Sequence, residues 1–156
     1  MLTYDLISRT TLGSAAATVT FNSFSGYADL VLVMIGGTTA ASGIQIQFNS
    51  DTGSNYSRTA VYGYGTGLGS ARNFNQTKGE IGGSWSANTV MICNIQDYAN
   101  TTTYKTAITR YSDPTDTVGE AATLWRSTSA ITSFTLLNDS TTFRSGSTFS
   151  LFGIAG

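Results

Sequence analysis

The first residues in this chain that could do chemistry are an aspartate and the hydroxyl and amide side chains around it. The segment 51–54, DTGS, has the composition of the tetrad used by aspartic proteases. That chemistry needs two such aspartates that share one proton, each lying among hydrophobic residues. Here Asn49, Ser50 and Asn55 flank the tetrad, and all three are polar. We therefore interpret the segment as a glycine-containing turn between two strands.

The same segment also has oxygen-bearing side chains at alternate positions, as calcium loops do. Asn49, Asp51 and Asn55 would supply these oxygens, but the glutamate that a calcium loop carries further along is missing. We therefore favour a turn held by hydrogen bonds to the Asp51 side chain, and calcium binding stays the alternative. The acidic cluster formed by Asp113, Asp116 and Glu120 is likewise interpreted as a solvated turn.

Other catalytic systems lack their components in this sequence. It contains no histidine, which removes Ser-His-Asp and Cys-His systems and most transition-metal sites. Glycoside hydrolases need two carboxylates within about 10 Å of each other in a cleft, and no two acids are evidently paired on one strand face. Cys93 lies in the apolar run 90–93, where we expect a buried, unreactive thiol. The sequence thus predicts a non-enzyme with no catalytic residue, cofactor or metal ion.

Composition narrows the classes of partner. Only 11% of the residues are charged, against about 25% in typical domains, while the chain has 19 serines and 26 threonines. The net charge is −1 with basic residues scattered singly, so we expect no nucleic-acid partner. The longest apolar run, 30–35, is too short to span a bilayer. An export signal has basic residues near its start, where this sequence has Asp5, so we expect no export signal. Because few residues are charged, copies of the chain repel one another only weakly, which favours a role as a subunit of an assembly.

Hydrophobic residues recur with a period of two along most of the chain. Ile44, Ile46 and Phe48 alternate with polar residues, which places one strand face on a core. Turn-forming residues separate such runs, and we expect strands over 3–9, 16–22, 28–36, 43–49, 56–64, 88–96, 103–111, 120–127, 131–138 and 147–154. This pattern predicts one all-β domain, 1–156: an antiparallel β-sandwich of jelly-roll type with about eight to ten strands.

Two segments depart from this alternation. The run 30–35 is apolar on both faces, so it should lie at the centre of the structure or pack its outer face against another subunit. The segment 63–88 is rich in alternating glycines and predicts a long exposed loop with room for a short hairpin. Tyr56, Tyr62 and Tyr64 stand beside Ser, Asn and Gly, a context typical of adaptable recognition of a protein or a glycan.

Four landmarks carry a resemblance to a known group of proteins. They are YDLI at 4–7 with VTF at 19–21, YADLVL at 27–32, IQFNSDTGSNY at 46–56, and ITSFTL at 131–136 with the terminal LFGI at 151–154. With these the chain resembles small β-sandwich proteins from the virions of tailed bacteriophages, most weakly over 65–88. Such proteins occur as capsid decoration (cement) proteins and as modules of tails and fibres. The resemblance implies a virion protein with a jelly-roll-like sandwich and no catalysis.

These observations lead to one functional hypothesis and one alternative. The hypothesis is a capsid decoration protein, assembled in the host cytoplasm, that binds the outer capsid surface and stabilises contacts between shell subunits. Its expected partners are the major capsid protein and copies of itself, as a trimer in preference to a dimer. The alternative is a tail-associated or receptor-binding module that recognises a host surface glycan, and a stand-alone lectin comes third.

The expected docking residues lie in the glycine-rich segment and near the N-terminus. Aromatic residues and arginine are the types that most often anchor interfaces. On this basis we expect the partner-binding residues to be Tyr4, Tyr64, Leu68, Arg72, Phe74 and Trp85. The competing interpretation of Phe74 and Trp85 is that they close one end of the sandwich.

Overall fold

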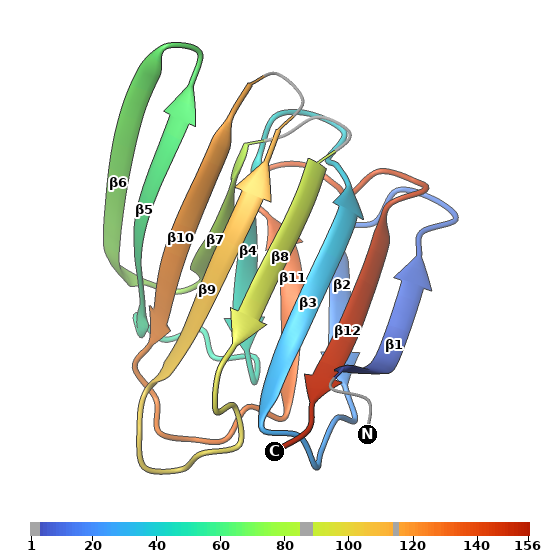
Figure 1. Ribbon diagram of the computed structural model, residues 1–156, viewed down its shortest axis with the longest axis vertical. Helices are drawn as coiled ribbons and strands as arrows, with labels where there is room; N and C mark the ends of the chain where they lie inside the picture. The colour runs from blue at the N-terminus through green and yellow to red at the C-terminus, as the bar shows by residue number, and fades with distance from the viewer. Residues whose placement is uncertain (1–3, 85–88, 114–115) are drawn as a thin grey trace.

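The computed structural model describes residues 4–84, 89–113 and 116–156, which form two antiparallel sheets packed face to face. The larger sheet has eight strands, in the order β1 (Tyr4–Thr11), β12 (Thr148–Ile154), β3 (Asp29–Gly36), β8 (Thr89–Ile95), β9 (Lys105–Ser112), β10 (Val118–Trp125), β5 (Tyr56–Tyr64) and β6 (Gly67–Gln76). The smaller sheet has four, in the order β2 (Thr18–Asn22), β11 (Ser133–Asn138), β4 (Gly43–Phe48) and β7 (Gly79–Ser84). Figure 1 looks onto the larger sheet, with the smaller sheet behind it.

The path of the chain between the sheets is that of a jelly roll. Strands β1 to β5 alternate between the larger and the smaller sheet, and β10, β11 and β12 do so again. On their return, β12 lies between β1 and β3, and β11 lies between β2 and β4. The predicted all-β antiparallel sandwich is therefore confirmed, and the start of β1 and the end of β12 lie side by side at the same end of the sandwich (Figure 1).

The core lies between the sheets and follows the predicted alternation. Ile44, Ile46 and Phe48 on β4 are fully buried, and they face a row of buried side chains from the larger sheet. Because alternate side chains of a strand point to opposite faces, most of the strands give every second residue to this core, whereas β6 gives none. Within the described residues no helix has the length and hydropathy of a membrane span.

In the residues that the structure describes, the predicted long loop at 63–88 is wrong, but a hairpin, which the prediction allowed, is present and is longer than expected. Strand β6 pairs with β5 through a hairpin whose turn is Gly65-Thr66, and β7 pairs with β4. Glycine has a low propensity for strands, so propensity alone favours a loop here. Tertiary pairing overrides it, because β6 adds a ladder to the long strand β5 and Gly65 adopts the left-handed φ of +53° that the tight turn needs. The described residues thus form twelve strands rather than eight to ten.

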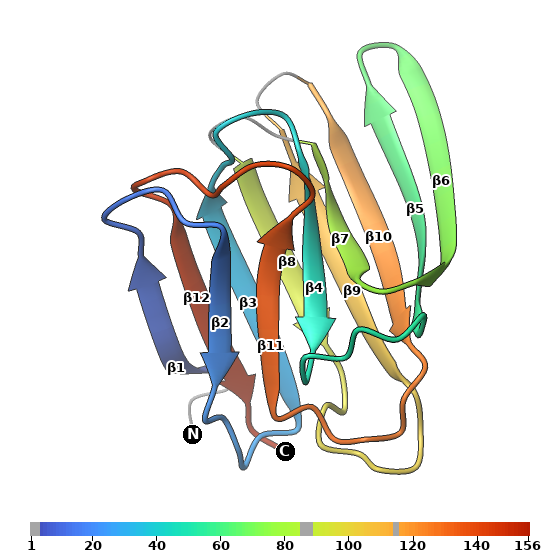
Figure 2. The same ribbon diagram turned by 180° about the vertical axis from the view of Figure 1, so that it is seen from behind.

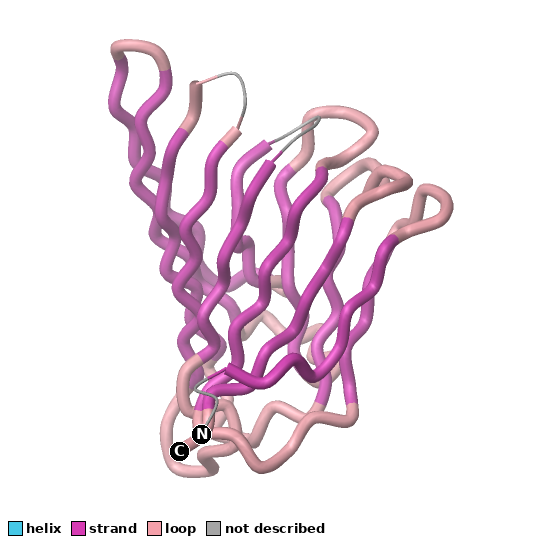
Figure 3. The backbone as a smooth tube through the Cα atoms, turned by 45° about the vertical axis from the view of Figure 1, so that its right-hand side comes forward, coloured by secondary structure: helices cyan, strands magenta, loops and turns pink. Residues whose placement is uncertain are grey.

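The two sheets differ in width, and this difference creates an open inner surface. Strand β7 is an edge strand of the smaller sheet, and β5 and β6 lie beyond it (Figure 2). The β5–β6 hairpin also projects past the ends of the other strands, as the side view in Figure 3 shows. The inner face of β5 is buried at Tyr56, Arg58 and Ala60, but it is more open at Tyr62 and Tyr64, beyond the edge of the smaller sheet.

Candidate functional site

The turn at 51–55 is built around the Asp51 carboxylate. Asp51 Oδ1 accepts a hydrogen bond from the Gly53 amide at 2.8 Å, and Oδ2 accepts from Asn55 Nδ2 at 2.9 Å. Oδ2 also accepts from the indole Nε1 of Trp125 at 2.6 Å. The predicted Asx turn is confirmed. Burial raises the pKa of Asp51, but these hydrogen bonds outweigh burial and hold the pKa below its usual value.

The remaining polar candidates behave as structural groups. Cys93 on β8 is fully buried as predicted, and burial raises the pKa of its thiol to about 11. The predicted turn at 113–116 includes residues 114–115, which lie outside the described residues. On either side of them, the Asp113 amide donates to the Thr117 carbonyl at 2.8 Å. In the described part of the chain, no three His, Cys, Asp or Glu side chains gather closely enough to hold a metal ion.

The outer surface of the larger sheet carries a continuous apolar area, which we call the outer apolar face. It is formed by alternate residues of five adjacent strands: Leu6, Phe152, Ile154, Val31, Val33, Ile35, Val90, Ile92 and Ile108. Leu6, Ile35, Val90 and Ile108 of this face are exposed to solvent. The run 30–35 therefore buries Leu30, Leu32 and Met34 in the core and turns its other apolar side outwards.

The strand register brings these apolar side chains together, although the polar Asn94 interrupts the row across the sheet. Leu6, Phe152 and Val31 stand side by side on β1, β12 and β3, and Asn94 and Ile108 extend the same row over β8 and β9. A shallow groove of about 340 Å³ crosses the face between Tyr4, Phe152 and Arg110. Contiguous exposed apolar surfaces of this kind mark sites of protein contact.

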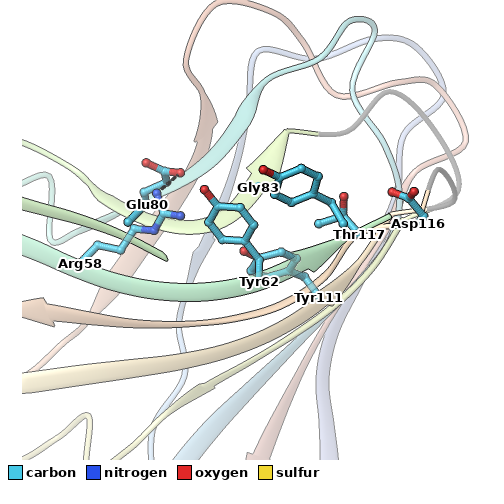
Figure 4. A pocket seen from close by; sticks show the side chains of 9 residues that line it. Arg58, Tyr62, Glu80, Gly83, Tyr111, Asp116 and Thr117 are labelled. Carbon is cyan, nitrogen blue, oxygen red and sulfur yellow. Dashed lines mark ion pairs between the residues drawn. The ribbon is translucent and has the colours of Figure 1, made fainter. Parts of the chain in front are cut away.

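On the opposite side of the same sheet lies a second candidate, which we call the tyrosine cleft. It has a volume of about 600 Å³ and is lined by Arg58, Tyr62, Tyr64, Ala71, Glu80, Gly83, Tyr111, Asp116 and Thr117. Figure 4 shows Arg58 and Glu80 at one end, Tyr62 and Tyr111 in the middle, and Asp116 and Thr117 at the other end. The cleft occupies the inner surface that β7 leaves uncovered.

A cross-strand row of tyrosines and glycines shapes this cleft. Tyr111, Gly119, Tyr62 and Gly69 are neighbours on β9, β10, β5 and β6. A Cβ on Gly119 would lie 2.5 Å from the ring of Tyr111, and a Cβ on Gly69 would lie 2.5 Å from the ring of Tyr62. Each ring therefore lies over the glycine beside it. This explains why glycine occupies these strand positions despite its low strand propensity.

The electrostatics of the cleft centre on an ion pair. Arg58 Nη1 contacts Glu80 Oε1 across the space between β5 and β7, and the Arg58 side chain is buried. Burial raises the pKa of Glu80, and the nearby Arg58 guanidinium opposes this rise. Burial likewise raises the pKa of Tyr111, again against the influence of Arg58. Arg58 Nε is buried and has no hydrogen-bond partner among the described residues.

The predicted docking residues do not form one patch. Tyr4 is exposed beside the outer apolar face, and Leu68 is 92% exposed on the same side of the sheet. Arg72 is exposed on β6, where it pairs with Thr59 of β5. Phe74 is 63% exposed, so it does not close one end of the sandwich. Tyr64 lines the tyrosine cleft on the other face. Trp85 lies outside the described residues.

Sequence reasoning missed the cleft residues Arg58, Glu80 and Tyr111. Each belongs to a different strand, so no local spacing links them. A usable signal was present at Tyr62 and Tyr64, which alternate with glycines before a two-residue turn, as in a hairpin.

Comparisons with known proteins give only distant structural likenesses. No family model matches this sequence, and no curated protein matches it. The Caenorhabditis elegans galectin LEC-6 is similar at 11% identity over 95% of this chain and 96% of its own, with a TM-score of 0.36. The alginate lyase Aly36B is similar at 10% identity over 94% and 77% of the two chains, with a TM-score of 0.31. A human SPRY domain is similar at 11% identity over 92% and 96%, with a TM-score of 0.22. At these scores the likenesses carry no information on function.

Proposed function

We propose that this protein is a structural component of a bacteriophage virion, a capsid decoration protein that binds the outer surface of the shell through its outer apolar face. The observation that carries the proposal is the cluster of outward apolar side chains on β3, β8 and the strands beside them, with Ile35 and Val90 exposed at one end of these strands. Bound in this way, each copy stabilises contacts between neighbouring shell subunits.

The size of the face favours many weak contacts over one strong contact. Five strands spaced about 4.8 Å apart, each rising about 3.3 Å per residue, give a footprint of roughly 20 by 20 Å. A standard protein interface buries about 800 Å² on each partner, so one copy alone would bind modestly. Repetition over a shell compensates, because many linked contacts add up by multivalency.

The chemistry of the surface and the sequence resemblance support the same proposal. Only 11% of the residues are charged, so few charged groups of this protein lose water when it docks on the shell. The landmarks at 27–32 and 46–56 resemble those of phage virion proteins. The low charge also favours contact between copies of the protein. We expect these copies to form a trimer rather than a dimer, and light scattering at micromolar concentration would separate such an oligomer from a monomer.

The alternative, a tail-associated module that recognises a host surface glycan, rests on a different observation. The tyrosine cleft exposes Tyr64 and part of Tyr62 beside the polar groups of Asp116 and Thr117. The cleft and the outer apolar face lie on opposite faces of one sheet. One experiment on virions therefore separates the two functions.

The test compares virions that lack the protein before and after purified protein is added back. Wild-type protein should bind the shells and raise the temperature at which they burst. Ile35→Glu and Val90→Glu should abolish binding without unfolding the domain, because both side chains are exposed and a charge there must lose water on docking. Bound protein is measured by sedimentation, and shell integrity by release of the genome on heating.

Thr18→Glu is the matched control, since Thr18 is exposed on the smaller sheet, away from the proposed interface. It should bind shells as the wild type does. Shells that are equally robust with and without the protein, together with lost adsorption to host cells, would reject the decoration role and support glycan recognition.

A further inference from the structure

We infer that the tyrosine cleft is a binding site for a neutral oligosaccharide. The cleft lies on the inner face of β5 and β6, opposite the outer apolar face, so it stays open when that face is docked. The inference is therefore independent of the partner proposed for the outer face.

The first argument is the aromatic platform. The Tyr62 and Tyr64 rings have centroids 6.0 Å apart and planes inclined by 31°, so they form one stepped apolar surface. Tyr64 is 52% exposed, and Tyr62 is partly exposed. Gly69 under the Tyr62 ring and Gly67 beside the Tyr64 ring leave room for both rings to lie along the sheet. A pyranose ring presents an apolar C–H face of matching shape, and tyrosine offers a rigid apolar body with a polar tip.

The second argument is the set of polar groups around this platform. Asp116 and Thr117 lie at one end, and the Arg58–Glu80 ion pair lies at the other (Figure 4). The buried Nε of Arg58 has no partner among the described residues, so this end of the cleft holds an unsatisfied hydrogen-bond donor. A few convergent polar groups beside an aromatic surface are the usual composition of a ligand site.

The third argument is the length of the polar surface. Beyond the ion pair a smaller cavity of about 140 Å³ is lined by Gln45, Asn73, Gln76, Lys78 and Asp139, and it shares Arg58 and Glu80 with the tyrosine cleft. Gln45 Oε1 is buried there without a hydrogen-bond partner among the described residues. From Tyr64 to Arg58, strand β5 rises by roughly 20 Å at about 3.3 Å per residue. This length fits a short oligosaccharide rather than a single sugar.

The charge of the cleft selects among saccharides. The cleft is lined by two carboxylates, Glu80 and Asp116, and one guanidinium, and that guanidinium is already paired with Glu80. An acidic sugar would therefore meet net negative charge, whereas a neutral sugar offers only hydroxyls that carboxylates and Arg58 can bind. The site thus favours neutral chains over uronic acid chains.

The test is binding of the whole protein to an array of neutral and uronic acid oligosaccharides, followed by titration calorimetry with the best neutral ligand. We expect a neutral chain to bind and uronic acid chains not to bind. Tyr62→Ala and Tyr64→Ala should each weaken binding about tenfold through lost stacking, and Tyr62→Phe should retain most of it. Tyr64 is half-exposed on the hairpin, so its removal leaves the core intact.

Val61→Ala is the matched control, because Val61 neighbours Tyr62 on the same strand and lines a groove on the outer side of the sheet. It should bind the ligand as the wild type does. The inference is overturned if no neutral oligosaccharide binds at millimolar concentration. Preference for uronic acid chains, or neutral binding that survives both tyrosine-to-alanine changes, would overturn it as well.

Discussion

Asp51 shows at the scale of a single residue how a catalytic-looking motif becomes a structural one. Its carboxylate accepts hydrogen bonds from the Gly53 amide, the Asn55 side chain and the Trp125 indole. Trp125 is buried on β10, so this interaction fastens the turn after β4 to the larger sheet. The residue therefore joins two sheets, which is more than the local turn that the sequence predicts.

Replacing Asp51 with alanine should lower the free energy of unfolding by about 2 kcal/mol, because a buried indole N–H loses a charged acceptor. Urea denaturation measures this loss. Thr52→Ala, in the same turn but exposed, should change stability little. In a Trp125→Phe background the Asp51→Ala change should cost less, because the shared hydrogen bond is already absent. Equal cost in both backgrounds would contradict the assigned role.

At the scale of elements, the row of tyrosines and glycines explains why a glycine-rich segment forms a strand. The rings of Tyr111 and Tyr62 lie over Gly119 and Gly69, so the side chains missing at the glycines are replaced by their neighbours. The ladder between β5 and β6 then provides the hydrogen bonds that a loop would lack.

Gly119→Ala should destabilise the domain by about 1–3 kcal/mol, because its new Cβ would lie 2.5 Å from the buried ring of Tyr111 and the ring must move. Thermal unfolding measures the effect. Gly63→Ala is the matched control on the neighbouring strand, where the nearest side-chain atom, on Leu68, would be 3.7 Å away. A Gly119→Ala protein as stable as the Gly63→Ala protein would contradict the packing described here.

At the scale of the whole molecule, a buried thiol and buried tyrosine hydroxyls make the free energy of unfolding depend on pH in the alkaline range. Burial raises the pKa of Cys93 to about 11, and burial also raises the pKa values of Tyr56 and Tyr111. A raised pKa in the folded state means that the unfolded chain loses its protons first. The stability that these groups contribute is thus present at neutral pH and is lost as pH rises.

We expect the free energy of unfolding to fall between pH 8 and pH 11, with Cys93 contributing on the order of 2 kcal/mol, since an unfolded thiol ionises near about 8.5. The lowered pKa of Lys105, caused first by its burial, acts in the opposite direction in the same range and reduces the net fall. Denaturation curves at several pH values measure the slope. Cys93→Ala should have a shallower slope, and identical slopes would contradict the assignment.

Local sequence pattern was sufficient for most of the strands and for one turn. Ten of the strands, all except β6 and β7, lie where alternation and turn residues predict them, because a strand with one buried face repeats every second residue. The Asx turn at Asp51 was also predictable, since its bonds to Gly53 and Asn55 join close neighbours in the chain. The outward apolar side of 30–35 was visible in the sequence as a run without alternation.

Only the tertiary structure decided where the binding surfaces lie. The outer apolar face depends on the register of β1, β12 and β3, which brings Leu6, Phe152 and Val31 into one row from distant parts of the chain. The tyrosine cleft depends on the different widths of the two sheets and on the Arg58–Glu80 contact between β5 and β7. Sequence periodicity reports which face of a strand is buried, but it carries no information on which strands become neighbours. Pairing between distant segments sets both surfaces, so neither could be located from the sequence by itself.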